Sequence, residues 1–273
     1  MRIVLALFIF LSVSILVVSS CSKDPENNNT SNNDRLSYGD TVFYVKNQTY
    51  TINPNFTEPG TYSAFPGNLL IDPVTGRITV SIIGKGDESQ TGLKYKIKFQ
   101  ATNSGKVDST YITIGGINYL DQVYYLSRND SIIRPVYNAN INKQLPSGTY
   151  GINPDSRLSI NPLNGEININ ECIRKGMFNL PLEHGEWEEV TITYKSNDAS
   201  NSANNSIDIS LYYYDSEASI PSNVSAAMRA HQSQVLGVPQ VAVPITTGPI
   251  DNDLPDNLSI NRPRPPCVII VGL

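Results

Sequence analysis

The residues that most often carry enzyme chemistry are sparse in this sequence. Its two histidines, His184 and His231, belong to no metal-spaced pair such as H-E-x-x-H, so zinc sites and hydrolytic triads lack their usual parts. Asp251, Asp253 and Asp256 lie close together in the sequence, where a calcium site is one interpretation; without EF-hand spacing or glycine we favour a solvated acidic loop. We expect no catalytic residue, no metal and no cofactor.

Cys21 is the reactive residue with the most informative surroundings. Residues 1–20 hold one charge, Arg2, and an apolar run that ends in two serines directly before Cys21, as in a secretion signal. The run is too short to span a membrane comfortably. The sequence VSSC at residues 18–21 resembles the lipobox of bacterial lipoproteins. The resemblance implies cleavage before Cys21 and its diacylation, for example with palmitate, which gives a stable membrane anchor.

Residues 21–38 read as a flexible tether, because they contain no large apolar residue before Leu36. The charges of Lys23, Asp24 and Glu26 resemble the export signals that send some lipoproteins to the exterior face of the outer membrane. We therefore expect a lipid-anchored outer-membrane protein that faces the cell exterior, with the periplasmic face as the open alternative.

Cys172 and Cys267 are the two cysteines that remain if Cys21 carries lipid. They can form a disulfide outside the cytoplasm, and two buried free thiols are an equally favoured alternative.

Charge excludes one class of partner. The formal net charge is -5, and removal of residues 1–20 with Arg2 makes it -6, so nucleic acid is not an expected partner. Charged residues make up only 16% of the chain, which is typical of an extracytoplasmic β module rather than a cytosolic enzyme.

The chain contains a tandem repeat. Residues 69–81 (LLIDPVTGRITVS) return 89 positions later as residues 158–170 (LSINPLNGEININ), each with an Asx-Pro turn closed by glycine and followed by alternating apolar residues. Other matches recur at offsets of 81 to 95 residues, and the offset only increases along the chain, which indicates loop insertions in one scaffold. We predict an all-β fold of two tandem immunoglobulin-like sandwiches at residues 39–117 and 118–215.

The first repeat also resembles cadherin-like and bacterial immunoglobulin-like modules, on the run L-x-I-D-P-x-T-G-x-I-x-V and the strand that follows it. The resemblance implies the sandwich fold and leaves the ligand open. The acidic calcium ligands of cadherins are missing, since the junction at residues 115–125 offers only Asp121.

Alternation predicts the orientation of individual strands. In residues 93–101 (LKYKIKFQA), Tyr95, Ile97 and Phe99 should be buried while three lysines face solvent. Residues 216–273 form a proline-rich tail in which residues 225–237 can make a short helix, and residues 267–273 (CVIIVGL) predict a terminal strand. An exposed strand of this kind would aggregate, so we expect it to add to an existing sheet of its own chain or of a neighbouring copy.

Adjacent tyrosines are the candidate ligand contacts. In a strand, neighbouring side chains point to opposite faces, so each group should expose at least one aromatic ring to a sugar or a protein. The alternative is a set of tyrosines that cover an edge of the sandwich. The residues concerned are Tyr124, Tyr125, Tyr212, Tyr213 and Tyr214.

These features favour a membrane-anchored, non-catalytic binding or adhesion module for a glycan or protein ligand. The second interpretation is a fimbrillin-like subunit of a surface fibre, which donates its C-terminal strand to a neighbour. A degradative enzyme stays open because two glycosidase carboxylates can converge from anywhere in a sequence. It ranks third, since two small sandwiches without long loops leave little room for a closed active site.

Overall fold

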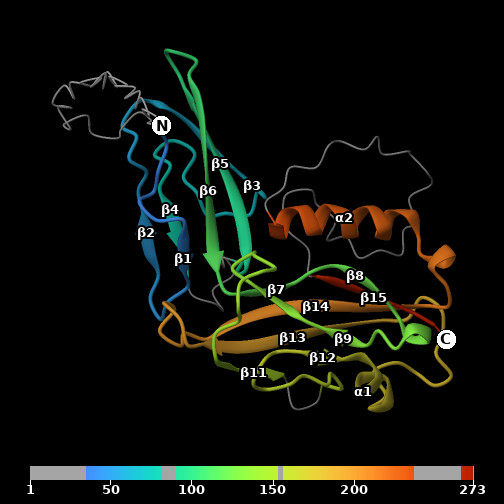
Figure 1. Cartoon of the computed structure of the whole chain (residues 1–273). Coiled ribbons are helices and arrows are strands. Elements are labelled where there is room, and N and C mark those ends of the chain that lie inside the picture. Colours follow the sequence, from blue (N-terminus) through green and yellow to red (C-terminus); the bar gives the residue numbers. More distant parts are fainter. Residues whose placement is uncertain (1–34, 82–89, 153–155, 237–265, 273) are drawn as a thin grey trace, which may run out of the picture. The chain divides into compact units, whose positions relative to one another are not determined.

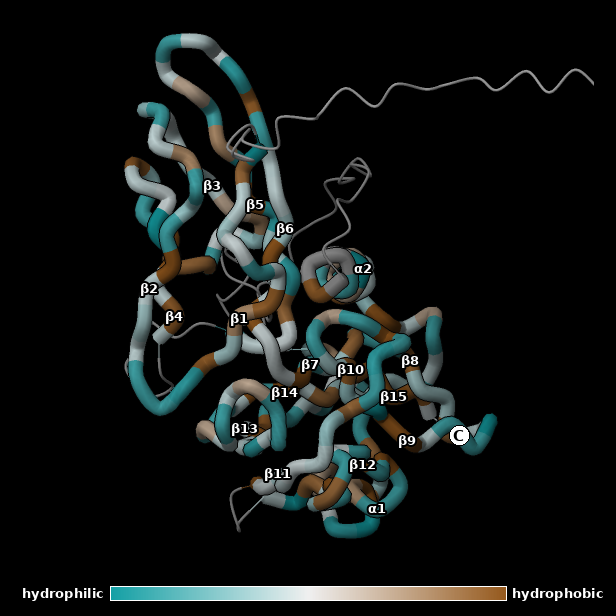
Figure 2. Tube along the Cα trace, turned by 60° about the vertical axis from the view of Figure 1, so that its left-hand side comes forward, coloured by the Kyte–Doolittle hydropathy of each residue, from teal (hydrophilic) through white to brown (hydrophobic). Residues whose placement is uncertain are grey.

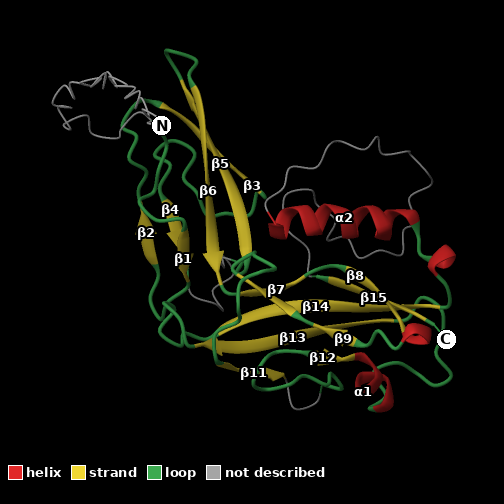
Figure 3. Cartoon of the chain, in the orientation of Figure 1, coloured by secondary structure: helices red, strands yellow, loops and turns green. Residues whose placement is uncertain are grey.

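The structure is a computed structural model that describes residues 35–81, 90–152, 156–236 and 266–272. The signal segment, Cys21, most of the predicted tether and residues 237–265 of the predicted tail lie outside the described residues. Strands dominate what is described, and helices are few (Figure 3). Neither α-helix of this part of the chain is long and apolar enough to cross a bilayer.

The first sandwich consists of a four-stranded sheet in the order β1-β6-β5-β3 and a two-stranded sheet, β2-β4 (Figure 1). β1 runs parallel to β6, while β5 is antiparallel to both of its neighbours. The strands are β1 (Val42–Tyr44), β2 (Tyr50–Ile52), β3 (Gly60–Phe65), β4 (Ile78–Val80), β5 (Leu93–Ala101) and β6 (Val107–Gly115).

The first core confirms the register predicted for β5, because Tyr95, Ile97 and Phe99 are fully buried while the lysines between them face away. Hydrophobic and hydrophilic bands follow one another along the tube in both sandwiches (Figure 2). Leu36 and Tyr38, which the sequence boundary assigned to the tether, also lie in this core.

The second sandwich is built around a five-stranded sheet in the order β11-β13-β14-β15-β8, with two small sheets, β12-β9 and β10-β7. Its elements are β7 (Ile117–Tyr119), β8 (Gln122–Tyr125), the 3-10 helix η1 (Leu126–Arg128), β9 (Ile132–Ile133), β10 (Pro135–Tyr137), β11 (Gly148–Ile152), β12 (Ile167–Asn168), α1 (Ile169–Arg174), β13 (Trp187–Ser196) and β14 (Asn205–Tyr214). After β14 come the 3-10 helix η2 (Glu217–Ser219), α2 (Ser222–Leu236) and β15 (Cys267–Val271). The all-β class with two tandem immunoglobulin-like sandwiches is confirmed.

The two repeated turns share a backbone hydrogen bond and a left-handed glycine. Gly76 donates its N–H to the Asp72 carbonyl, and Gly165 donates its N–H to the Asn161 carbonyl, with an N–O distance of 2.9 Å in both turns. Both glycines have φ +68, a left-handed conformation that glycine adopts at little cost. In each repeat a tyrosine ring packs against the glycine, Tyr62 in the first and Tyr150 in the second, so an added Cβ would lie 3.0 Å or less from the ring.

One predicted strand is shorter than the alternation indicated. The apolar residues after the second turn predict a strand through Ile169, but β12 ends at Asn168 and α1 begins at Ile169. The Asn168 side chain accepts the Glu171 N–H at 3.1 Å and caps the helix. The N-x-x-E spacing of a helix N-terminus was therefore present within the apparent strand.

β15 fills an interior position of the second sheet. It runs parallel to β14 on one side and to β8 on the other, and all five of its residues are buried. The prediction of a strand that joins a sheet of its own chain is confirmed. β15 is an interior strand and not an edge strand, since it separates β8 from β14. In the first sandwich no strand intervenes at the corresponding place, and β1 pairs with β6 directly.

α2 covers the outer face of this sheet (Figure 1). Its residues Val224 and Met228 pack against a cluster that contains Tyr214, Cys267 and Ile269. Near its other end, Val235 is fully buried in the core of the first sandwich. The helix therefore belongs to the packed structure and not to a free tail.

Candidate ligand-binding face of the first sandwich

The outward side of the β1-β6-β5-β3 sheet is basic. We call its outward positions the basic face; they are Val42, Tyr44, Thr61, Ser63, Phe65, Lys94, Lys96, Lys98, Gln100, Val107, Ser109, Tyr111 and Thr113. Three of these positions are lysines and none is a carboxylate, although the whole chain carries 25 acidic and 20 basic residues. An acidic protein thus carries three lysines and no carboxylate at the outward positions of this sheet.

Two aromatic side chains flank the central lysine of the basic face. Lys96 is paired with Phe65 on β3 and with Tyr111 on β6, and these two rings are 46% and 37% exposed. The ammonium groups of Lys94 and Lys96 lie 5.0 and 5.9 Å from the centroid of the Tyr111 ring. Both distances fit cation–π contacts, which hold the ammonium groups close to the sheet.

A pocket of about 520 Å³ adjoins one end of the basic face. One wall comes from the sheet, with Lys94, Tyr111 and Thr113 on β5 and β6 and with residues 41–42 at β1. The other wall is the loop at residues 138–141, in which Ile141 is 63% exposed. Its volume falls within the roughly 300–1,000 Å³ of small-molecule sites.

The loop wall is held in a fixed conformation. Asn138 and Ala139 both have left-handed φ values, 52 and 54. The Asn138 side chain stabilises this loop conformation. Its Oδ1 accepts the Gly116 N–H at 2.8 Å, and its Nδ2 donates to the Tyr44 hydroxyl at 2.8 Å. A wall fixed in this way loses little conformational entropy when a ligand binds.

The matching strand of the second sandwich has different chemistry. At an offset of 95 residues, the positions of the three lysines on β5 are occupied on β13 by Glu189, Thr191 and Thr193. Thr191 donates its hydroxyl to Asp208 on β14 at 2.5 Å. The basic face is therefore a property of the first sandwich and not of the repeated scaffold.

The tyrosines expected to contact ligand lie on both sides of the second sheet, as alternation requires. Tyr124 and Tyr213 are buried in the main core. Tyr125, Tyr212 and Tyr214 face the opposite side, where they belong to or pack against the cluster beneath α2. No continuous exposed tyrosine strip forms among the described residues, because the helix covers the face on which the outward rings would lie.

Two aromatic side chains outside that set are more accessible. Trp187 is 46% exposed and stacks on Tyr212 with ring centroids 6.1 Å apart. Tyr111 lies on the basic face. Neither ring was identified from the sequence as a candidate contact, and the position of Tyr111 opposite Lys96 comes from the register between β5 and β6.

Cys172 and Cys267 are both buried, and neither forms a disulfide. Alternation along β15 explains why the candidate disulfide does not form. Val268 and Ile270 face the main core that holds Cys172, whereas Cys267 faces the cluster beneath α2, so the sheet lies between the two thiols. Burial raises the pKa of the Cys172 thiol to about 11, which makes it a poor nucleophile at neutral pH.

Asp121 and His231 form a buried polar contact that the sequence did not predict. The His231 Nδ1 lies 2.6 Å from the Asp121 Oδ1, and both side chains are at most 2% exposed. The same carboxylate oxygen accepts the Cys267 N–H at 2.8 Å. One aspartate therefore connects the start of β8, helix α2 and the first residue of β15.

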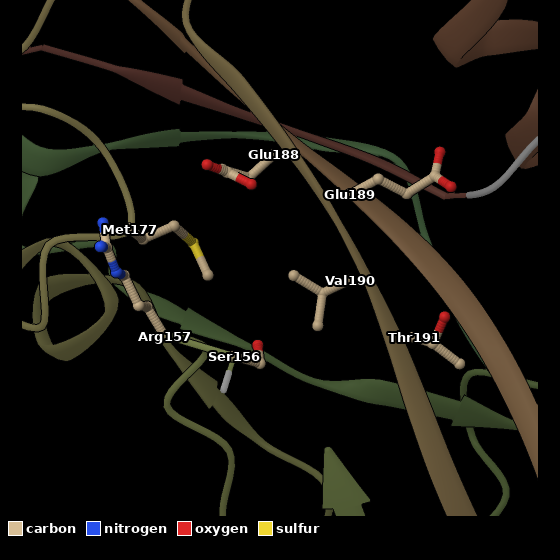
Figure 4. Close-up of a pocket in the computed structure, with 7 residues that line it drawn as sticks. All are labelled: Ser156, Arg157, Met177, Glu188, Glu189, Val190 and Thr191. Atoms are coloured by element: carbon tan, nitrogen blue, oxygen red, sulfur yellow. The ribbon is translucent and has the colours of Figure 1, made fainter. Parts of the chain in front are cut away.

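A second pocket, of about 530 Å³, lies beside β13 (Figure 4). Met177 and Val190 line its apolar part, and the Arg157 guanidinium donates to the Gly176 carbonyl. The carboxylates of Glu188 and Glu189 lie on opposite sides of the strand, so they do not converge on one point (Figure 4). This pocket has no cluster of like charge comparable to that of the basic face.

The described ranges contain no group of three or more histidine, cysteine or acidic side chains placed to hold a metal ion. His184 lies 3.7 Å from Asp215 at the surface. Cys21 and the acidic residues 251, 253 and 256 lie outside the described residues.

Comparison with known proteins yields similarity to solved structures alone. No family model and no curated protein matches the chain. Among solved structures, it aligns with Drosophila N-cadherin EC1-4 (11% identity, 65% of this chain, 48% of that chain, TM-score 0.21) and with human protocadherin-24 EC1-2 (9%, 66%, 97%, TM-score 0.22). The chain thus spans about half of the N-cadherin structure, and TM-scores this low carry no inference about function.

Proposed function

We propose that this chain is a lipid-anchored, non-catalytic binding module at the outer-membrane surface, and that the basic face of its first sandwich binds an anionic glycan or protein. The observation that carries the proposal is the composition of that face, with three lysines, two exposed aromatic rings and no carboxylate. The lipid anchor at Cys21 and the tether behind it would hold this face away from the membrane.

Electrostatics and aromatic contact act together on such a surface. Clustered positive charges raise the rate at which an anionic partner associates, and this effect weakens as salt screens it. Aromatic rings beside the lysines supply contact area with little loss of conformational entropy, since they have only two side-chain torsions. A ligand with both negative charge and apolar surface matches this combination.

Retention on immobilised polyanions tests the proposal. The chain from residue 21 onward, with Cys21→Ala to remove the lipid, is applied at low salt to columns of heparin, polygalacturonate and polyglutamate. We expect at least one column to retain it and salt to release it. Lys96→Glu should weaken binding by about tenfold or more, equivalent to about 1.4 kcal/mol.

Lys195→Glu is the matched control, because Lys195 is also exposed on a central strand but belongs to the second sandwich. It removes the same charge without touching the basic face. Equal loss of retention in Lys195→Glu and Lys96→Glu would assign binding to net charge, and passage of the unsubstituted chain through every column would refute the proposal.

A fibre subunit is the second candidate function, favoured by the position of β15. β15 lies parallel to and between β8 and β14. The β15 strand of another copy can occupy the same place in an exchange of strands between copies. Size-exclusion chromatography separates the two functions. A ladder of oligomers supports strand exchange, whereas a monomer at all concentrations supports the binding module alone.

A further inference from the structure

We infer that the pocket at the end of the basic face binds a carboxylate-bearing sugar ring, so that the ligand of the module is an acidic glycan. This inference rests on the proposed function and narrows it to one ligand class. It depends on the charged, polar and apolar side chains that line the pocket, and on which of their polar atoms already form hydrogen bonds within the protein.

Lys94 is the one ionisable cation among the residues that line the pocket. The Tyr111 ring lies 5.0 Å from its ammonium group, which holds the charge near the pocket before any ligand arrives. A single positive charge fits a single carboxylate. It fits a phosphate or a sulfate cluster less well, since such groups are usually held by several cations or a series of backbone N–H groups.

The uncharged polar groups suit hydroxyls. Thr41 and Thr113 provide hydroxyls from the sheet, and Asn140 provides an amide from the loop. The Asn140 Oδ1 already accepts the Asn142 N–H at 2.9 Å, so its NH₂ group remains as the donor. Side chains that both donate and accept are the ones that match a ring of hydroxyls.

The apolar part of the pocket suits the C–H face of a sugar ring. Val42 lies at the sheet wall, and Ile141 is 63% exposed at the loop wall. An exposed isoleucine on a loop that is fixed by hydrogen bonds offers a contact surface whose position does not change on binding. A purely polar anion such as a free dicarboxylate would leave this surface unused.

The rest of the basic face can hold the next units of a chain. Lys96 and Lys98 follow Lys94 along β5, with Phe65 beside Lys96. A polymer with a carboxylate on successive sugars would therefore meet successive lysines after its end unit enters the pocket. A neutral polymer would gain nothing from them.

Defined oligosaccharides test the inference. Oligogalacturonate and oligogalactose of equal length differ in the carboxylate at each ring, and both are titrated calorimetrically into the full mature chain with Cys21→Ala. We expect oligogalacturonate to bind at least about tenfold more tightly. Lys94→Met, which keeps an unbranched stem, should remove most of this difference, while Lys195→Met should leave it unchanged.

Ile141→Ser distinguishes a sugar from an acidic peptide. This change leaves all lysines in place, so retention on polyglutamate should stay unchanged while oligogalacturonate affinity falls several-fold. Melting curves check that each variant is folded. Equal affinity for the neutral and acidic sugars, or polyglutamate binding with the same dependence on Ile141, would overturn the inference. Retention on polyglutamate without any sugar binding would overturn it while leaving the proposed function intact.

Discussion

Deletion of residues 267–273 should unfold the second sandwich rather than only destabilise it. β15 contributes Val268 and Ile270 to the main core and Ile269 and Val271 to the cluster beneath α2, and each of these four side chains is at most 6% exposed. Full burial of a valine or isoleucine contributes roughly 1.5–3 kcal/mol. The four together contribute about 6–12 kcal/mol, which is comparable to the total stability of about 5–15 kcal/mol that is typical of a folded protein.

Backbone pairing adds to this loss. β8 is hydrogen-bonded to the rest of its sheet through β15, and β14 would also lose its parallel neighbour. The deletion would therefore expose two strand edges in addition to the apolar side chains, and exposed edges promote association.

Chemical denaturation followed by circular dichroism measures the loss of unfolding free energy. Single substitutions in β15 measure how much each side chain contributes to it. Ile269→Ala and Ile270→Ala act on opposite faces of the same strand, and each should cost roughly 2–5 kcal/mol. Leu163→Ala is the control, since Leu163 is 73% exposed and should change stability by less than about 0.5 kcal/mol. A deleted chain that unfolds at the same denaturant concentration as the full chain would refute the structural role of β15.

Three further predictions concern other parts of the chain. Phe99→Ala should lower the unfolding free energy by about 3–5 kcal/mol and Lys96→Ala by well under about 1 kcal/mol; equal melting shifts would contradict the β5 register. Asp121→Ala leaves His231 and a backbone N–H without their buried acceptor and should cost about 3–5 kcal/mol in urea unfolding, whereas Asp121→Asn, which keeps one acceptor oxygen, should cost less. Cys21→Ala should move the protein from the detergent phase to the aqueous phase, and unchanged partition would rule out the lipid anchor.

Local pattern was sufficient for much of the fold. Alternation gave the buried face of β5, and the Asx-Pro-x-x-Gly spacing gave both repeated turns, because each depends on residues close together in sequence. A short helix from residue 225 and a terminal strand from residue 267 were also predicted, and α2 (Ser222–Leu236) and β15 (Cys267–Val271) lie there. The capping by Asn168 was missed because an apolar alternation overlapped a helix start signal.

The features that were not predicted depend on distant residues. Alternation correctly places adjacent tyrosines on opposite faces, but it does not say whether a second layer covers the outer face, as α2 does here. The same limit applies to the position of β15 between β8 and β14. The lysines of the candidate site were recognised as exposed, whereas their aromatic neighbour Phe65 emerged only from the register between β3 and β5.

The interior position of β15 has a consequence for the order in which the chain can fold. β15 follows every other described element in the sequence, and its first residue bonds to Asp121, 146 positions earlier. The other strands of the second sheet are therefore synthesised before β15, and the sheet cannot close until β15 has been made. Contacts between such distant residues form slowly, because a long loop must close before they add stability. A chain that ends before β15 would keep this sheet open, with β8 and β14 each exposing an unpaired edge.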